Sequence, residues 1–312
     1  MKPDVLLAVP IYPATMEALD RLYAVHRLFE AADPVAFLGG VADKVRAIVT
    51  SGGAGADAAL IAALPKAEII ACFGVGYDAV DLGAARARNI AVTNTPDVLT
   101  DDVADLALGL IIDAARRISR GDRFVRAGKW LQGGLELGTA LRGRRLGIVG
   151  LGRIGLAAAR RAEACGMFVA YHGPRPKPEA PYPYVADLVE LARRSDVLVL
   201  TLPGGTGTRH LVNAEVLAAL GPKGTLVNVA RGSVVDETAL LAALQSGALG
   251  AAALDVFADE PRVPPALLAM ENVVLQPHVG SATHETRAAM GQLVLDNLAA
   301  HFAGQALPTR VA

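Results

Sequence analysis

Short apolar segments alternate with segments of helical periodicity through the first hundred residues of the chain. The apolar segments are almost uninterrupted by polar residues, and most are followed closely by Gly or Pro. The pattern predicts strands at residues 5–9, 35–38, 45–49, 69–73 and 90–93, and helices at residues 15–30, 56–64 and 82–88. Continuous apolar strands that alternate with helices are typical of a parallel sheet covered on both faces.

The alternation resumes after a long helix and a glycine-rich stretch. The helix is predicted from Thr100 to about residue 118, with Thr100 as its N-cap and two acids, Asp101 and Asp102, at its positive end. Residues 127–144 lack periodicity and are predicted to form a loop. Further strands are expected at residues 146–149, 167–171, 197–202, 225–229, 251–256 and 273–276, with helices at residues 154–165, 185–193, 213–220, 236–246 and 282–302.

Two such series predict an α/β protein with two doubly wound parallel-sheet, Rossmann-like domains. One domain comprises residues 1–99 and 283–312, and the other, residues 100–282, is inserted in it. In open sheets of this kind, ligands bind beyond the carboxyl ends of the strands. Residues that directly follow the strands are therefore the candidates for a functional site.

Three glycines stand between a predicted strand and a predicted helix in the order G-x-G-x-x-G. Gly150 permits a sharp turn, Gly152 lets a pyrophosphate approach the backbone, and Gly155 lets the helix lie close to the strand. The start of the helix offers N–H groups and a partial positive charge to phosphates. Because a second strand follows at the right distance, the inserted domain is predicted to bind a dinucleotide, and the other domain is then expected to hold the substrate.

The segment after that second strand bears on which dinucleotide binds. An NAD site usually carries an Asp or Glu about 20 residues after the first glycine, where it binds the ribose 2′-hydroxyl. Here no carboxylate occurs before Glu179, whereas His172, Arg175 and Lys177 could bind a 2′-phosphate. NADPH is therefore predicted in preference to NADH, and the alternative is a solvated basic loop. Residues 173–184 contain five prolines and are predicted to be an extended loop.

Composition narrows the class of protein. Hydrophobic residues make up 53% of the chain, so two apolar cores can be built, and a net charge of −1 offers no basic footprint for nucleic acid or a membrane surface. Cys72 and Cys165 occur in apolar contexts and are expected to be reduced thiols, not a disulfide or a metal site. No apolar run reaches spanning length and no signal-peptide core is present, so we expect a soluble, cytoplasmic protein without a metal.

Three ionisable residues, Arg231, Glu260 and His278, follow three different predicted strands of the dinucleotide domain. Singly, Arg231 can be a surface charge and His278 a structural hydrogen-bond partner. Together they suggest carbonyl reduction, since a guanidinium can hold a substrate carboxylate and an imidazolium paired with a carboxylate can act as general acid. The nicotinamide would supply the hydride.

These residues lie in motifs that resemble the D-isomer-specific 2-hydroxyacid dehydrogenases, most closely the glyoxylate/hydroxypyruvate reductase branch. The matching stretches occur in order along nearly the whole chain: FGVGYD at 73–78, NTP at 94–96, VAD at 103–105, LGIVGLGRIG at 146–155, NVARG at 228–232, VDE at 235–237, LDVF at 254–257, EP at 260–261 and PHVGSAT at 277–283. The resemblance implies Arg231, Glu260 and His278 as the catalytic set for reduction of a small 2-keto acid to the D-2-hydroxy acid.

The resemblance also implies that the backbone N–H groups of Val75 and Gly76 hold the substrate carboxylate and that Asp255 faces the nicotinamide carboxamide. Ser51 and Gly52, at the end of a predicted strand, are expected to line the substrate cleft. Further cofactor contacts are expected at Thr100, Arg153, Ile154, Leu202, Pro203, Val229, Ala230 and Gly280.

Asp236 and Glu237 are interpreted as an N-cap and a first-turn acid, not as site residues. A homodimer is expected. Trp130, in the glycine-rich loop, is either a contact to a neighbouring active site or an interface anchor without a substrate role.

Two other functions stay open. A nucleotide-sensing binding protein can be built on the same fold, since fold alone does not decide function. A D-3-phosphoglycerate dehydrogenase-like enzyme is the other, but the turns at 51–53 and 74–77 offer no basic residue for its phosphate, and no regulatory domain is expected. Formate oxidation is disfavoured because the formate dehydrogenases of the family carry Gln where Glu260 stands. Glyoxylate, hydroxypyruvate, hydroxyphenylpyruvate and a sugar keto acid all remain candidate substrates.

Overall fold

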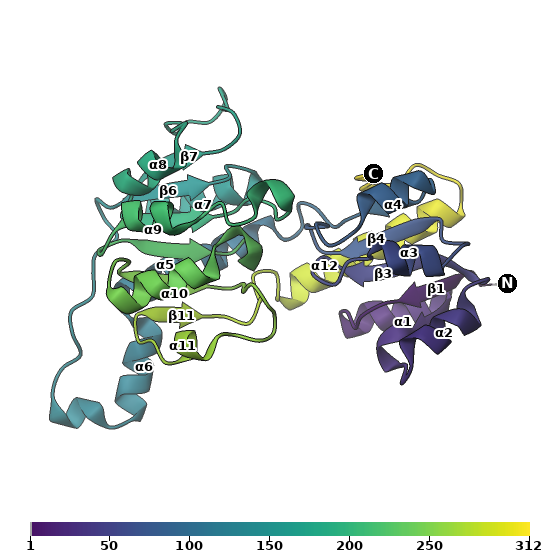
Figure 1. Cartoon of the computed structure of the whole chain (residues 1–312), viewed down its shortest axis with the longest axis horizontal. Helices are drawn as coiled ribbons and strands as arrows, with labels where there is room; N and C mark the ends of the chain where they lie inside the picture. The colour runs from purple at the N-terminus through teal and green to yellow at the C-terminus, as the bar shows by residue number, and fades with distance from the viewer. Residues whose placement is uncertain (1) are drawn as a thin grey trace. The chain divides into compact units, whose positions relative to one another are not determined.

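A computed structural model describes residues 2–312 and divides them into two compact α/β units (Figure 1). Unit 1 comprises the residues up to Leu99 together with Ser281–Ala312, and unit 2 is Thr100–Gly280. Each unit contains one sheet whose strands are all parallel. The predicted α/β fold class with two parallel sheets is therefore confirmed, and the second unit limit lies two residues before the predicted one.

The five-stranded sheet of unit 1 has the order β2-β1-β3-β4-β5. Its strands are β1 (Asp4–Leu7), β2 (Ala24–Arg27), β3 (Val45–Ser51), β4 (Ile69–Phe73) and β5 (Ala91–Thr93). Its helices are α1 (Pro13–Leu22), α2 (Pro34–Val41), α3 (Ala58–Ala63), α4 (Leu82–Ala87) and α12 (His284–Phe302), with a short 3-10 turn at Leu28–Glu30. Helix α12 packs against β4 and α1, so the last segment of the chain completes the unit that the first segment began.

The six-stranded sheet of unit 2 has the order β11-β10-β9-β8-β6-β7. Its strands are β6 (Arg145–Val149), β7 (Phe168–His172), β8 (Val197–Leu200), β9 (Thr225–Asn228), β10 (Ala251–Leu254) and β11 (Val273–Leu275). Its helices are α5 (Thr100–Arg116), α6 (Ile118–Arg126), α7 (Arg153–Ala164), α8 (Leu188–Arg194), α9 (Ala214–Leu220), α10 (Glu237–Ser246) and α11 (Pro265–Leu268), with 3-10 turns at Lys129–Gln132, Thr206–Thr208 and Gly232–Val234. Helix α5 packs against α7, while α8, α9 and α10 share one apolar core with the strands.

Short polar side chains start most of these helices. Each accepts a hydrogen bond from a first-turn N–H group that the helix itself leaves unsatisfied. The capping residues are Asp33, Asp57, Asp81, Asp187, Asn213, Asp236 and Thr283. The interpretation of Asp236 as an N-cap and Glu237 as a first-turn acid is confirmed, since Asp236 accepts from Ala239 N–H.

Two predicted elements of unit 1 are wrong. The helix predicted over 15–30 ends at Leu22, and Ala24–Arg27 instead forms the edge strand β2 beside β1. All four residues of β2 are half-buried, so they show no strand-like alternation, and pairing with β1 decides their structure. The strand predicted at 35–38 is part of helix α2, whose start is capped by Asp33 and followed by Pro34 at the first helical position.

The long helix of unit 2 also differs from its prediction. Thr100 is the first residue of α5 and not its N-cap. The helix ends at Arg116 because Arg117 takes a left-handed conformation with φ +58°, after which α6 starts in a new direction. Helix α6 was not predicted, since its strongly charged sequence buries no residue.

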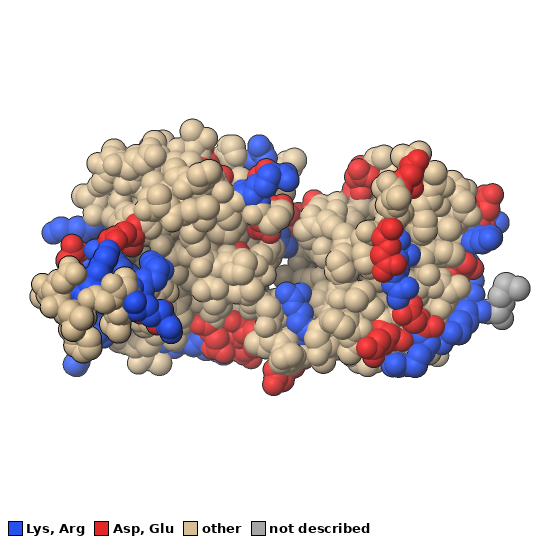
Figure 2. Space-filling view, turned by 90° about the horizontal axis from the view of Figure 1, so that it is seen from below, with Lys and Arg blue, Asp and Glu red and all other residues tan. Residues whose placement is uncertain are grey.

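Charged side chains of both signs share the face of the molecule drawn in Figure 2. On the face drawn in Figure 2, Lys and Arg are interspersed with Asp and Glu, and basic side chains gather over α6, which carries Arg120, Arg123 and Arg126. Within residues 2–312, no helix is both long and apolar enough to cross a membrane. The same residues contain no cluster of three or more His, Cys, Asp or Glu side chains suited to a metal ion, and both cysteines are free thiols.

Candidate active site

The predicted site residues of unit 2 follow successive strands along one edge of its sheet. From β7 to β11 through the sheet order, the carboxyl ends carry His172, the glycine turn, Leu202–Pro203, Val229–Arg231, Asp255 and His278. The chain runs from β6 outward to β7 and then returns to β8 on the other side of β6. The strand order therefore reverses between β6 and β8, and doubly wound sheets bind nucleotides at such a reversal.

The three glycines of the turn after β6 differ in the space around them. Gly150 has φ +95°, and a Cβ there would lie within 2.9 Å of the Leu202 backbone. A Cβ on Gly155 would lie 2.4 Å from the Gly150 carbonyl oxygen and 2.8 Å from Thr201 Oγ1. Gly152 differs, since a Cβ there would meet nothing within 4 Å. The first and third glycines are thus required by packing, whereas the second leaves open space at the uncapped start of α7.

Basic side chains follow β7, and the first acidic residue after that strand is Glu179. His172 is the last residue of β7, and its Nδ1 bonds the Val185 carbonyl oxygen at 3.0 Å. Arg175 and Lys177 are exposed on the loop that follows. The open glycine turn fits the pyrophosphate of a dinucleotide.

His278 and Glu260 form a close pair. Nδ1 of His278 lies 2.6 Å from Oε2 of Glu260, and Phe257 N–H donates to the other carboxylate oxygen at 3.0 Å. Burial alone would raise the pKa of Glu260, but the hydrogen bond and charge of His278, the Phe257 N–H and the charge of Arg231 together lower it. Glu260 therefore remains ionised and is able to stabilise a protonated imidazole.

Asp255 holds the backbone that carries His278. Its two carboxylate oxygens accept from Val279 N–H at 2.8 Å and Gly280 N–H at 2.9 Å, and its carbonyl accepts from His278 N–H at 2.9 Å. His278 has φ +54°, a left-handed conformation that costs a side-chain-bearing residue about 1–3 kcal/mol unless its surroundings enforce it. Burial raises the pKa of Asp255, although the two N–H groups and the charge of His278 oppose that rise.

Arg231 enters the same edge from β9. Asn228, the last residue of that strand, accepts from Ala230 N–H at 3.0 Å and donates to the Arg231 carbonyl at 3.0 Å, which shapes the turn. The guanidinium donates to the Ala230 carbonyl at 2.8 Å. The positive charge of Arg231 is one of the causes that lower the pKa of Glu260. Arg231, Glu260 and His278 therefore interact electrostatically at this edge of the sheet.

Two further predicted contacts lie beside Asp255. A Cβ on Gly280 would be 3.1 Å from Asp255 Oδ2 and 3.4 Å from Val103 Cγ2. Val103 lies one turn after Thr100, so the start of α5, Gly280 and Asp255 are neighbours within unit 2. These residues are the predicted contacts to the nicotinamide end of the cofactor.

The remaining predicted site residues belong to unit 1, where they form two adjacent turns. Ser51 and Gly52 follow β3 and Val75 and Gly76 follow β4, and a Cβ on Gly74 would lie 3.4 Å from the Gly52 nitrogen. Within the described chain, the N–H groups of Val75 and Gly76 donate to no protein acceptor. Two such donors on one turn can bind a carboxylate.

Sequence reasoning did not assign roles to the side chains that shape this turn. Asn94 Nδ2 donates to the Val75 carbonyl at 2.8 Å, and Thr95 Oγ1 accepts from Gly74 N–H at 3.0 Å. Arg287, on the first turn of α12, stacks over the Phe73 ring at 5.5 Å, and burial lowers its pKa. Asn94 and Thr95 lie in the NTP motif, which was the available signal; nothing in the sequence pattern pairs Arg287 with Phe73.

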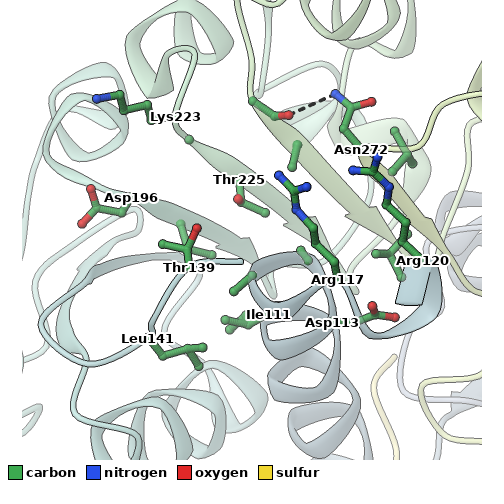
Figure 3. Close-up of a pocket in the computed structure, with 18 of the residues that line it drawn as sticks. Ile111, Asp113, Arg117, Arg120, Thr139, Leu141, Asp196, Lys223, Thr225 and Asn272 are labelled. Atoms are coloured by element: carbon green, nitrogen blue, oxygen red, sulfur yellow. Dashed lines mark hydrogen bonds between the residues drawn. The ribbon is translucent and has the colours of Figure 1, made fainter. Parts of the chain in front are cut away.

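A cavity of about 410 Å³ lies at the opposite edge of the unit 2 sheet, at the amino ends of its strands (Figure 3). Its walls include Arg117 and Arg120 beside the start of α6, and Asp196 and Thr225 at the starts of β8 and β9. None of the predicted site residues lines it. Because nucleotides bind at the carboxyl ends of such sheets, this cavity is not the candidate active site.

Comparison with known proteins agrees with the geometry. Residues 108–280 match a family model described as "D-isomer specific 2-hydroxyacid dehydrogenase, NAD binding domain". A hydroxyphenylpyruvate reductase of Plectranthus scutellarioides is 50% identical over 307 residues, and a glyoxylate/hydroxypyruvate reductase A of Arabidopsis thaliana is 48% identical over 307 residues, each alignment covering 98% of both chains.

A solved structure is similar over the whole chain as well. The NADPH-dependent glyoxylate/hydroxypyruvate reductase of Sinorhizobium meliloti, in complex with NADP and malonate, superposes with a TM-score of 0.94 at 46% identity and covers 100% of this chain and 97% of that one.

Proposed function

The chain belongs to the D-isomer specific 2-hydroxyacid dehydrogenase family, and we propose that it is an NADPH-preferring reductase in which Arg231, Glu260 and His278 form the catalytic set. As an oxidoreductase of the glyoxylate/hydroxypyruvate reductase branch, it reduces small 2-keto acids to 2-hydroxy acids with a nicotinamide cofactor. Unit 2 is the cofactor domain and unit 1 the substrate domain in this proposal.

The observation that carries the proposal is the 2.6 Å pair of His278 with Glu260 on the sheet edge that also holds the glycine turn. With Glu260 ionised, Nδ1 of His278 carries the shared proton, and Nε2 is left to donate a second proton. His278 protonates the carbonyl oxygen while the carbonyl carbon accepts a hydride, so the C=O bond becomes CH–OH and the imidazole is left neutral. A bound nicotinamide supplies that hydride.

Charged and polar groups orient the substrate in this scheme. In unit 2, Arg231 is the proposed bidentate partner of a substrate carboxylate and polarises the carbonyl. In unit 1, the N–H groups of Val75 and Gly76 are the proposed carboxylate donors. Asp255, near Thr100 and Gly280, would hold the nicotinamide carboxamide. Arg153 and Ile154 at the start of α7 would hold the pyrophosphate, and the further cofactor contacts would be Leu202, Pro203, Val229 and Ala230.

The preference for NADPH is supported by the composition of the loop after β7. His172, Arg175 and Lys177 occupy the place where an NAD site has an acid, and both Arg175 and Lys177 are exposed to solvent. The Sinorhizobium meliloti relative is an NADPH-dependent enzyme, which supports the same preference here.

Turnover with NADPH and glyoxylate tests the function, with hydroxypyruvate, hydroxyphenylpyruvate and 2-ketogluconate as further substrates. His278→Asn and Arg231→Ala are expected to lower kcat by about 10²–10⁴-fold with NADPH affinity retained. His26→Asn, on β2 of unit 1, is the control and should leave kcat unchanged. Cofactor binding without turnover of any 2-keto acid would instead favour a nucleotide-sensing protein. A preference for 3-phosphoglycerate oxidation would favour a D-3-phosphoglycerate dehydrogenase-like enzyme.

A homodimer is also part of the proposal. In Figure 1, α6 and the segment after it extend away from the sheet of unit 2. This arm, residues 118–137, exposes Trp130 (69%), Leu131 (94%) and Leu137 (92%), together with Ile118 and Val125. Apolar side chains so concentrated on one arm mark a protein interface. Light scattering of wild type and of Leu131→Asp with Leu137→Asp tests it: the wild type should be dimeric and the variant monomeric.

A further inference from the structure

Backbone hydrogen bonds join the two ends of the loop that follows β7. Tyr171 N–H donates to the Pro183 carbonyl at 2.9 Å, and Val185 N–H donates to the Tyr171 carbonyl at 2.8 Å. Tyr171 and Tyr184 therefore lie side by side, as a parallel bridge with ring centroids 5.4 Å apart. His172 adds a third tie at this base through its bond to the Val185 carbonyl at 3.0 Å.

The hydroxyl of Tyr171 bonds the backbone in the middle of this loop. Tyr171 is 1% exposed, and its Oη accepts a hydrogen bond from Lys177 N–H at 2.7 Å, while the hydroxyl donates to the Lys177 carbonyl at 3.4 Å. Tyr184 Oη donates to the Gly173 carbonyl at 3.0 Å. Residues 173–177 are thus held at both ends by tyrosine hydroxyls, and this is the half of the loop that carries Arg175 and Lys177.

Such a constraint matters for binding a small anion with exposed cations. A flexible loop would have to be ordered on each binding event, which weakens the affinity. The prolines limit the backbone freedom of this loop, but they do not hold it against unit 2. The Tyr171–Lys177 bond does, because it joins the middle of the loop to a side chain in the core.

We propose that Tyr171 is a positioning residue for cofactor selection: its buried hydroxyl fixes the backbone at Lys177 and so shapes residues 173–177 to receive the 2′-phosphate. This inference rests on the proposed preference for NADPH. It assigns the selectivity to a residue behind the cationic side chains as well as to those side chains.

Binding of two nucleotide fragments tests the proposal without turnover. Calorimetry measures the affinity for adenosine 2′,5′-bisphosphate, which has the 2′-phosphate, and for 5′-AMP, which lacks it. In Tyr171→Phe the ring still fills the core but the hydroxyl is lost. We expect the affinity for the bisphosphate to fall by about 3- to 10-fold, as removal of one hydrogen bond implies, with the affinity for 5′-AMP unchanged within about twofold. Tyr184→Phe, which frees Gly173, is a second variant expected to act in the same direction.

Tyr182→Phe is the matched control. Tyr182 belongs to the same loop and is also buried, but its hydroxyl bonds Glu163 Oε2 on α7 at 3.2 Å and not Lys177, so both affinities should be unchanged. If Tyr171→Phe weakens both fragments equally, or neither, the positioning role is wrong. If the wild type already binds both fragments equally, the NADPH preference itself fails, and that result is visible before any variant is made.

Discussion

Nδ1 of His278 lies 2.6 Å from Oε2 of Glu260, and the second oxygen of that carboxylate is held by Phe257 N–H at 3.0 Å. With both oxygens engaged, the carboxylate cannot rotate without losing a partner. The pair therefore fixes the plane of the imidazole and directs its Nε2 away from Glu260. A general acid needs this fixed orientation as well as a suitable proton affinity.

Replacing Glu260 by Gln should lower kcat for reduction by about tenfold or more, because the charge-assisted hydrogen bond that orients His278 is lost. The pKa of Glu260 is lowered, so in wild type the charged carboxylate persists as the pH falls through the ordinary carboxyl range and is lost only below it. The profile of kcat against pH, measured for both proteins above and within that range, should therefore keep the difference between them.

Glu237→Gln is the control for that profile. Glu237 Oε1 accepts from Ala258 N–H at 3.1 Å, so it is a nearby carboxylate without contact to His278. Its profile should match the wild type. A wild-type kcat in Glu260→Gln would contradict a catalytic role for the pair.

Much of this site can be predicted from the sequence because its residues follow strands. The carboxyl ends of parallel strands share one edge, so Arg231 and His278 are expected near each other once β9 and β11 are recognised. The contacts that hold them cannot be predicted in the same way. The bonds from Asp255 to Val279 and Gly280 depend on a left-handed His278, and the stacking of Arg287 on Phe73 joins residues more than 200 positions apart.

The errors in the predicted fold have local causes. Val35 to Leu38 is apolar enough for a strand, but Asp33 and Pro34 supply a helix start that outweighs it. Ala24–Arg27 lies at the sheet edge with every residue half-buried, so its pattern contains no periodicity to recognise. Only the pairing with β1, which is a tertiary contact, defines it as a strand.

Alanine substitutions at two glycines of the turn after β6 should affect different properties, stability at one and cofactor KM at the other. Gly155→Ala forces a Cβ to 2.4 Å from the Gly150 carbonyl oxygen, so stability should fall by about 1–3 kcal/mol or more. Gly152→Ala has φ −79° and free space, so the melting temperature should be unchanged, whereas KM for NADPH and NADH should both rise because the methyl group obstructs the pyrophosphate. Thermal denaturation and steady-state kinetics measure both. Unchanged KM values in Gly152→Ala would remove the turn from the cofactor site.

Asp255 should make the stability of unit 2 fall as the pH rises, which is the reverse of the usual effect of a paired carboxylate. Burial, the largest cause, raises its pKa, and the N–H groups of Val279 and Gly280 oppose the rise. A folded-state pKa above the unfolded value gives stability that is present at low pH and is lost as the pH rises through it. Relative to Asp255→Asn, wild type should therefore lose urea stability as the pH rises from about 4.

Asp196→Asn provides a control of opposite sign. The hydrogen bonds of Arg145 lower the pKa of Asp196, so its contribution is present above the ordinary aspartate range and is lost as the pH falls. Urea unfolding of the two variants and wild type over the same pH series should show differences that change in opposite directions. Parallel changes would mean that the environment assigned to Asp255 is wrong.

The choice of cofactor should depend on the two exposed cations of the loop after β7. A charge-assisted hydrogen bond is worth about 1.5–3 kcal/mol, and exposure to solvent reduces that value, so one good contact to a 2′-phosphate favours NADPH by roughly tenfold or more. The double change Arg175→Ala with Lys177→Ala should therefore raise KM for NADPH by at least about tenfold and leave KM for NADH nearly unchanged.

The control removes two positive charges from the opposite edge of the same sheet, Arg144→Ala with Lys223→Ala, and should alter neither KM. High salt should reduce the wild-type preference, since exposed charges are screened. The measurement is kcat/KM for both cofactors in all three proteins; a wild type that prefers NADH, or an NADPH preference that survives the loop change, would contradict this role of the loop.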